Sequence, residues 1–157
     1  AERVEEFWNE FVLAGWGHVP IGVRLRGARR ENFADLEATV ERLARFEVAT
    51  AVDATGPDAV PVAVLESLSV RRVVIDAATV AQLEGTRCAV AAEVIGDAVT
   101  AAARLRLEVA GLGVSSGELA VSLARLGVDV AQAEASVPWT PAMATAPRLL
   151  AAPMAVR

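Results

Sequence analysis

Two carboxylates stand where their chemistry would matter most, because each directly ends a hydrophobic run of the chain. They are Asp53 and Asp76. Asp53 could serve as a ligand residue, and Asp76 could anchor a bound group. Asp53 is more simply interpreted as a solvated acid beside the turn Gly56-Pro57-Asp58, and Asp76 as the N-cap of a following helix. We therefore favour structural roles for both side chains.

Arginines gather in two parts of this acidic chain. One group is Arg71-Arg72, and the other contains Arg24, Arg26, Arg29 and Arg30. Guanidinium groups pair bidentately with phosphates, so these clusters could bind a phosphodiester. The alternative, which we favour, is a solvated surface with salt bridges to the acidic side chains of the next helix, which are Glu31, Asp35 and Glu37.

The three tryptophans differ in their surroundings. Trp8 lies on an amphipathic segment, where packing in the core is the default. Trp16 lies in a glycine-rich turn and Trp139 lies between prolines. These two are the better candidates for contacts with a partner.

Composition excludes several kinds of chemistry. The chain has 157 residues, 54% hydrophobic and 22% charged, with a net charge of −5, and its length predicts one domain. All fifteen basic residues are arginines, and there is no lysine or tyrosine, which excludes a lysine Schiff base and a tyrosine acid. Cys88 is the only cysteine and His18 is the only histidine, so neither an intramolecular disulfide nor a Cys/His zinc site can form. We expect no metal, no cofactor and Cys88 as a small core residue.

Charge also bears on partners and location. An acidic balance argues against nucleic-acid binding, which needs a basic surface. No stretch of about 18 residues is free of charge, so no membrane segment is expected within this chain. The charged opening Ala1–Glu10 does not look like a signal peptide, and we expect a cytoplasmic protein. Because the chain starts at Ala1, we expect a processed chain or a domain of a longer protein.

Hydrophobic periodicity predicts strands that alternate with helices. Spacings of three and four residues indicate helices, and short apolar runs indicate buried strands. The predicted helices with clear bounds are Glu2–Ala14, Val60–Leu68, Ala77–Leu83 and Gly117–Leu126. One more helix is predicted after its cap at Asn32, and its buried face contains Phe33, Leu36, Val40 and Leu43. The predicted strands are Val19–Leu25, Glu47–Asp53, Val70–Asp76 and Val128–Gln132. This alternation is typical of an α/β fold with a parallel sheet.

Two segments are less regular. Cys88–Leu105 reads either as a helix, with a strand at Leu107–Gly111, or as a strand over Cys88–Ile95 that places Glu93 near its end. We favour the helix, with Glu93 exposed. Prolines punctuate the Ala-rich end of the chain, where helix is disfavoured. We therefore expect one domain over residues 1–137 and a Pro/Ala-rich tail over residues 138–157.

The motif order resembles the cyclic-di-GMP phosphodiesterase family named for its EAL motif. The carrying residues are Val-Asp-Ala-Thr-Gly-Pro at 52–57 and Val-Val-Ile-Asp at 73–76, with a second match over Leu107–Val137. The resemblance covers Glu2 to Pro138, about the C-terminal five-eighths of the family's barrel. A complete barrel takes roughly 250 residues, so the strand with the signature motif is not in this chain. The resemblance implies an incomplete (βα)-barrel-like parallel sheet.

Departures from the family bear on activity. The family holds two divalent metals with carboxylates and an asparagine at the strand ends, and these activate water. By resemblance, Asp53 is the first of the paired aspartates, and Asp76 and Gln132 are retained. At the position of the family's second aspartate this chain has Ala54, and at that of the catalytic lysine it has Val74. Leu112 replaces the next glutamate, and Ser115 replaces the acid after it. The family's early glutamate falls at Arg24 or Val23. These residues cannot hold two metals, so we expect no phosphodiesterase activity.

The resemblance therefore implies a degenerate domain with another role. We expect a protein-interaction, regulatory or scaffold module that associates, as a homo-oligomer or with another protein, through the open side of the incomplete barrel. The alternative is a cyclic-di-GMP receptor without hydrolysis, with Asp53, Asp76 and Gln132 as remnant ligand residues. Our candidates for contact residues are Trp16, Arg24, Arg71, Arg72 and Trp139.

Overall fold

Five parallel strands form one sheet in the computed structural model, which describes residues 2–13, 22–26 and 33–133. The strands follow chain order across the sheet, β1-β2-β3-β4-β5. They are β1 (Gly22–Leu25), β2 (Ala49–Asp53), β3 (Arg72–Ile75), β4 (Glu108–Val114) and β5 (Val130–Ala133). Each strand is parallel to its neighbours. The α/β class and the parallel sheet are confirmed.

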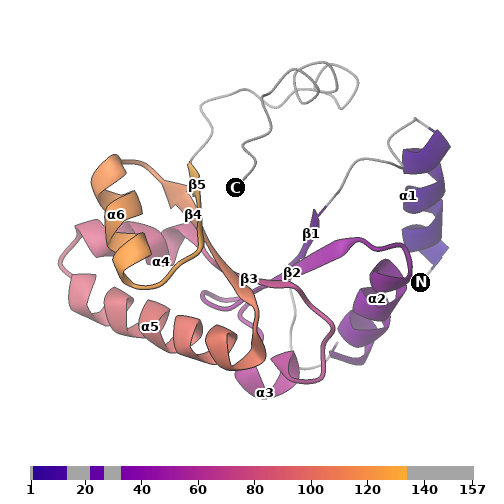
Figure 1. Cartoon of the computed structure of the whole chain (residues 1–157), viewed down its shortest axis with the longest axis horizontal. Helices are drawn as coiled ribbons and strands as arrows, with labels where there is room; N and C mark the ends of the chain where they lie inside the picture. The colour runs from indigo at the N-terminus through magenta and orange to yellow at the C-terminus, as the bar shows by residue number, and fades with distance from the viewer. Residues whose placement is uncertain (1, 14–21, 27–32, 134–157) are drawn as a thin grey trace.

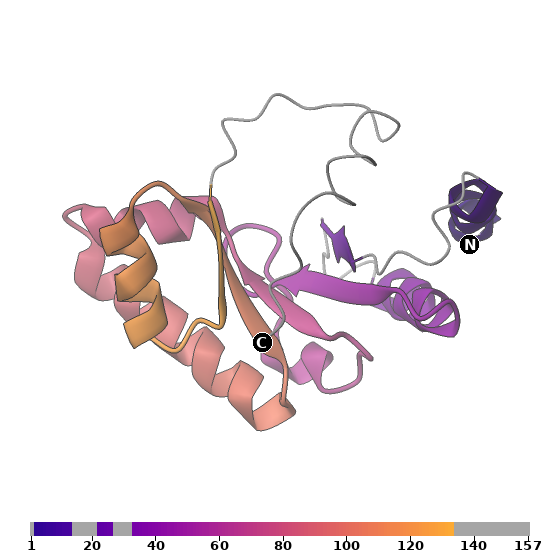
Figure 2. The same ribbon diagram turned by 45° about the horizontal axis from the view of Figure 1, so that its top comes forward.

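Helices connect the strands and lie outside the curved sheet (Figure 1, Figure 2). They are α1 (Glu2–Leu13), α2 (Phe33–Arg45), α3 (Val62–Leu65), α4 (Ala77–Ala81), the 3₁₀ turn η2 (Gln82–Glu84), α5 (Cys88–Leu105) and α6 (Gly117–Arg125). The core lies between these helices and the outer face of the sheet, where Val52, Val73, Ile75 and Val109 are buried. Alternate residues of each strand face the other way, toward the inner face of the sheet.

The segment with two possible readings is a helix. Helix α5 covers Cys88–Leu105 and buries Ala91, Ile95 and Ala102. Glu93 is exposed, as the helix predicts. The prediction of a buried Cys88 is wrong, since this thiol is exposed. It lies in the first turn of α5, before the buried stripe begins at Ala91.

The N-terminal helices α1 and α2 form where the sequence predicts helices. Helix α2 buries Leu36, Val40 and Leu43, whereas Phe33 is half-buried. Trp8 of α1 is also half-buried, and its ring stacks on Phe46 with centroids 5.4 Å apart. Packing of Trp8 is therefore partial.

The sheet does not close into a barrel. Within the described ranges, β1 pairs only with β2, and β5 pairs only with β4, whereas a closed barrel of this kind has eight strands. No helix among the described residues is long and apolar enough to cross a membrane. Trp16, the Asn32 cap, Arg29, Arg30, Trp139 and the predicted tail over residues 138–157 lie outside the described residues.

Candidate functional site

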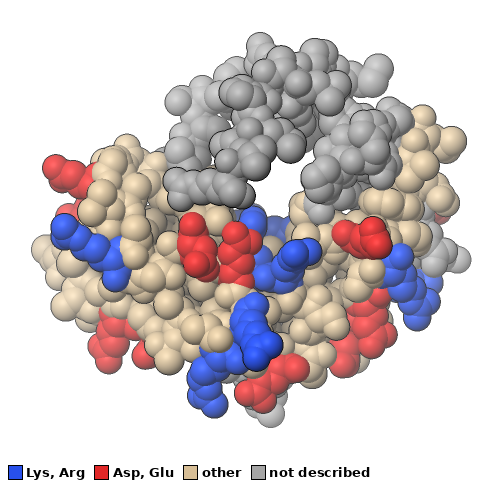
Figure 3. All heavy atoms as spheres, in the orientation of Figure 1, with Lys and Arg blue, Asp and Glu red and all other residues tan. Residues whose placement is uncertain are grey.

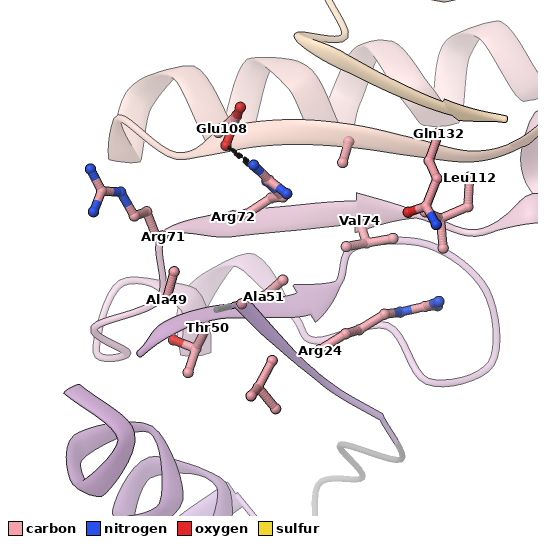
Figure 4. A pocket seen from close by; sticks show the side chains of 13 residues that line it. Arg24, Ala49, Thr50, Ala51, Arg71, Arg72, Val74, Glu108, Leu112 and Gln132 are labelled. Carbon is pink, nitrogen blue, oxygen red and sulfur yellow. Dashed lines mark hydrogen bonds and ion pairs between the residues drawn. The ribbon is translucent and has the colours of Figure 1, made fainter. Parts of the chain in front are cut away.

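The inner face of the sheet carries a hollow of about 570 Å³ (Figure 4). Residues from all five strands line it, because the inward positions of neighbouring parallel strands lie side by side. Four predicted site residues line it, namely Arg24, Arg71, Arg72 and Gln132. The other lining residues are Gly22, Val23, Ala49, Thr50, Ala51, Val74, Glu108, Ala110 and Leu112.

Asp53 is not the solvated acid that the sequence suggests. Its side chain is only 3% exposed, and it accepts a hydrogen bond from Arg24 Nε at 2.6 Å. Arg24 lies opposite Ala51 in the β1–β2 register. Because Ala51 has only a methyl group, the Arg24 side chain can extend along β2 to the carboxylate at its end. Hydrogen bonds between charged partners are among the strongest in proteins, so this pair fixes both side chains.

A second ion pair crosses β3 and β4. Arg72 and Glu108 are opposite each other in the register, and Arg72 Nε and Nη2 both donate to Glu108 Oε2, at 2.8 and 2.5 Å. Their side chains are 43% and 38% exposed. Glu108 went unrecognised in the sequence, because the pattern along the chain does not show that it lies opposite Arg72.

The predicted salt bridges to the acids of α2 do not form for Arg24 or Arg72, which pair across the sheet instead. Arg71 is exposed, and its side chain has no hydrogen bond or ion pair with any residue that the structure describes. Figure 3 shows basic and acidic side chains meeting in the middle of one face, over the strands. The hollow therefore combines two paired arginines with a third, directly before β3, that has no side-chain partner among the described residues.

Asp76 is the N-cap of α4, as predicted. Its carboxylate accepts hydrogen bonds from the backbone N–H groups of Ala78 and Thr79. It also accepts from the hydroxyls of Thr79 and Thr55, at 2.5 and 2.7 Å. Burial alone would raise the pKa of Asp76, but the hydrogen bonds from Thr79, Thr55 and the backbone outweigh it and lower the pKa. This carboxylate joins the loop after β2 to the start of α4.

The other positions that the family resemblance singles out are apolar or engaged elsewhere. Val74 is 3% exposed at the floor of the hollow, and Leu112 is half-buried beside it. The Ser115 hydroxyl lies 3.4 Å from Glu84. Among the described residues, no group of three or more His, Cys, Asp and Glu side chains could hold a metal ion.

Gln132 lines the hollow near the end of β5 and is exposed. Figure 4 shows it beside Leu112, with Arg24 on the opposite side of the hollow. The structure thus brings Arg24 and Gln132 to one surface and leaves Asp76 in its own network of hydrogen bonds.

Solved structures similar to this chain include a phosphodiesterase and an EAL domain. The PaMucR phosphodiesterase in complex with c-di-GMP has a TM-score of 0.69 and 22% identity over 83% of this chain. The EAL domain of Mycobacterium smegmatis DcpA has a TM-score of 0.65 and 22% identity, again over 83% of this chain. Klebsiella pneumoniae BlrP1, in a manganese/cy-diGMP complex, has a TM-score of 0.67 and 18% identity over 83%. No family model and no curated protein sequence matches the chain.

The chain spans only part of these structures: 52% of the PaMucR chain, 58% of the DcpA chain and 33% of the BlrP1 chain. The chain therefore has the fold of part of an EAL domain, without closure of the barrel.

Proposed function

We propose that this chain is a catalytically inactive EAL-like domain of the cytoplasm, which works as a protein-interaction or regulatory module in cyclic-di-GMP signalling. The ion pair of Arg24 with the buried Asp53 carries the proposal. By resemblance, Asp53 is the family's remaining metal-binding aspartate, and a guanidinium 2.6 Å away repels a divalent cation. Hard cations such as Mg²⁺ need several oxygen ligands, which Val74 and Leu112 do not offer.

An assay of hydrolysis tests the loss of activity. The full chain is incubated with cyclic-di-GMP and either Mg²⁺ or Mn²⁺, and linear product is measured by chromatography. We expect no turnover above the level without protein. Turnover that disappears in Asp53→Ala and persists in the matched surface variant Asp97→Ala would overturn the proposal.

The role in protein interaction is supported by the open sheet. Strand edges with unpaired backbone groups are templates for association with another chain, and β1 and β5 each lack a second neighbour within the described part of the chain. Light scattering on the purified chain measures its mass in solution. A mass above that of the monomer would support self-association, whereas a monomer at all concentrations would leave only a different protein as the partner.

The second candidate is a cyclic-di-GMP receptor that does not hydrolyse its ligand. The hollow supports it, since Arg24 and Gln132 line the inner face, and two similar structures are described as complexes with this nucleotide. Calorimetry separates the two candidates. Micromolar binding would favour the receptor, and no heat at millimolar nucleotide would remove it.

A further inference from the structure

We infer that the Pro/Ala-rich tail, residues 138–157, folds back over the inner face of the sheet and places the side chain of Trp139 in the hollow. This contact lies within the chain and goes beyond the proposed function, since it holds whether or not the domain is active. Four observations carry it: the shape of the hollow, the guanidinium groups in it, the place where β5 ends and the composition of the tail.

Small side chains make the hollow. Ala49, Ala51 and Ala110 line it from β2 and β4, and Gly22 lies beside Ala49 on β1. The interior of a complete barrel is usually filled by bulky branched side chains in layers. Here the small residues leave about 570 Å³ above an apolar floor that includes Val74. Protein interiors are densely packed, so this space suits a large side chain from a segment outside the sheet.

The arginines of the hollow favour an aromatic side chain as its occupant. Arg24 and Arg72 line the hollow, and each is paired with a carboxylate, yet their side chains are 29% and 43% exposed. A paired guanidinium still offers its flat face to an aromatic ring. The described residues that line the hollow include no aromatic side chain. A ring brought from elsewhere would therefore gain these contacts without displacing an existing ion pair.

The end of β5 brings the tail close to the hollow. β5 ends at Ala133, and Gln132 directly before it lines the hollow beside Leu112 (Figure 4). Trp139 stands six positions after Ala133, and six residues of extended chain reach about 20 Å. Five strands span about the same width, because neighbouring strands lie about 4.8 Å apart. Trp139 is therefore within reach of the whole inner face, including Arg24 on β1.

The composition of the tail favours burial. Residues 138–157 contain Trp139, two leucines and two methionines, and their only charged side chains are Arg148 and Arg157. Segments that stay exposed to water have few large apolar residues and a high net charge, which is the opposite composition. The tail therefore needs an apolar surface, and the hollow offers one.

The prolines and the covalent link to β5 favour this occupant over a separate molecule. Pro138 and Pro141 flank Trp139 closely, and their fixed backbone angles oppose a helix and reduce the entropy that is lost when an extended segment docks. A segment joined to its site by a short linker has an effective concentration of about millimolar there. A second molecule would need a comparable concentration to compete with the tail.

The fluorescence of Trp139 tests the inference directly. The full chain is prepared with Trp8→Phe and Trp16→Phe, which leaves Trp139 as its only tryptophan. We expect Trp139 to emit at a shorter wavelength, and to be quenched several-fold less by acrylamide, than in the same protein unfolded in urea. The reason is that a ring in the hollow is shielded from water and quencher. Both values should stay the same on dilution, because the contact lies within one chain.

Two pairs of variants locate the contact. Ala51→Phe fills the hollow and is expected to raise the quenching of Trp139 to that of the unfolded protein, whereas Ala103→Phe, on the exposed side of α5, should not change it. Circular dichroism checks that Ala51→Phe folds. The second pair does not depend on that variant: Trp139→Ala in the otherwise unaltered chain should lower the urea midpoint, and Trp139→Phe, which keeps an aromatic ring, should lower it less.

Four outcomes would overturn the inference. They are equal quenching of Trp139 in the folded and unfolded protein, quenching unchanged by a folded Ala51→Phe variant, a urea midpoint unchanged by Trp139→Ala, and protection that is lost on dilution, which would place the ring against a second copy. None of them removes the proposed function, which the hydrolysis assay tests by itself. Turnover of cyclic-di-GMP would remove the proposed function and leave the Trp139 contact standing.

Discussion

At the scale of single residues, the main feature is the charge pair at the end of β2. Arg24 and Asp53 are 29 positions apart in the chain and meet at 2.6 Å. Asp53 is 3% exposed, whereas Arg24 is 29% exposed. A carboxylate that is buried this deeply needs a cation or several donors. Arg24 supplies that cation from within the fold.

Replacing Arg24 by Met is expected to destabilise the protein by about 2 kcal/mol, because it leaves the buried Asp53 carboxylate without its cation, while the partial exposure of Arg24 limits the loss. Urea denaturation at pH 7 measures it. The double variant Arg24→Met/Asp53→Asn should regain part of the loss. The matched control is Arg72→Met, which breaks the exposed pair with Glu108 and should cost about 0–1 kcal/mol. Equal losses of stability in Arg24→Met and Arg72→Met would contradict the expectation that the buried ion pair contributes more than the exposed one.

The Asp76 network predicts a dependence of stability on pH. The folded protein holds the pKa of Asp76 below its ordinary value of 3.8. This stabilisation is therefore fully present above the pKa of the unfolded chain and is lost as pH falls through the lower pKa of the folded chain. Thr79→Val removes one donor and should cost about 1 kcal/mol at neutral pH. The difference from wild type should shrink below pH 4, as the carboxylate becomes protonated.

Thr79→Ser is the matched control, since it keeps the hydroxyl that Asp76 needs. It should keep the pH dependence of the wild-type protein in acid and urea titrations. A constant difference between Thr79→Val and wild type from pH 7 to pH 2 would show that packing, not the hydrogen bond, explains the loss.

At the scale of elements, β4 depends on an irregularity. The register of β4 with β5 shifts between Leu112 and Val114, and Gly113 between them has a φ of +71°. A Cβ atom there would lie 2.6 Å from the Cβ of Ala77, at the start of α4. Gly113 therefore lets β4 and α4 approach closely, which helps to set the position of the inner face.

Gly113→Ala is expected to cost about 3 kcal/mol, from a left-handed backbone conformation and a clash in a packed region. The matched control is Gly96→Ala in α5, where nothing lies within 4 Å of the added carbon. Since glycine weakens helix interiors, that change should stabilise the protein by about 0.5–1 kcal/mol. Thermal denaturation measures both. A mild effect of Gly113→Ala would mean that α4 shifts easily relative to β4.

At the scale of the whole molecule, the open sheet with its Arg24–Asp53 ion pair predicts that metal ions do not change the stability of the protein. A ligand that binds only the folded state raises the denaturation midpoint with its concentration. We expect Mg²⁺, Mn²⁺ and EDTA to leave the midpoint of this chain unchanged, because Arg24 already neutralises Asp53. A rise with Mn²⁺ that disappears in Asp53→Asn would contradict this prediction. Differential scanning fluorimetry is sufficient for the comparison.

Much of the fold was predictable because periodicity is a local property. The buried faces of α2 and α5 follow from spacings of three and four residues, and the sheet follows from apolar runs that alternate with helices. The N-cap at Asp76 was also predictable, since a cap depends on the residues directly after it. Cys88 was misplaced because periodicity does not show where along a helix the packed stripe begins.

The sequence by itself determined the α/β order, the parallel sheet, the residue types at the strand ends and the absence of lysine. Only the tertiary structure decided that Asp53 is buried against Arg24, that Arg72 pairs with Glu108, and that three alanines leave a hollow. The physical reason is register. A pattern along the chain shows which residues share a face, but the pairing of strands decides which of them meet.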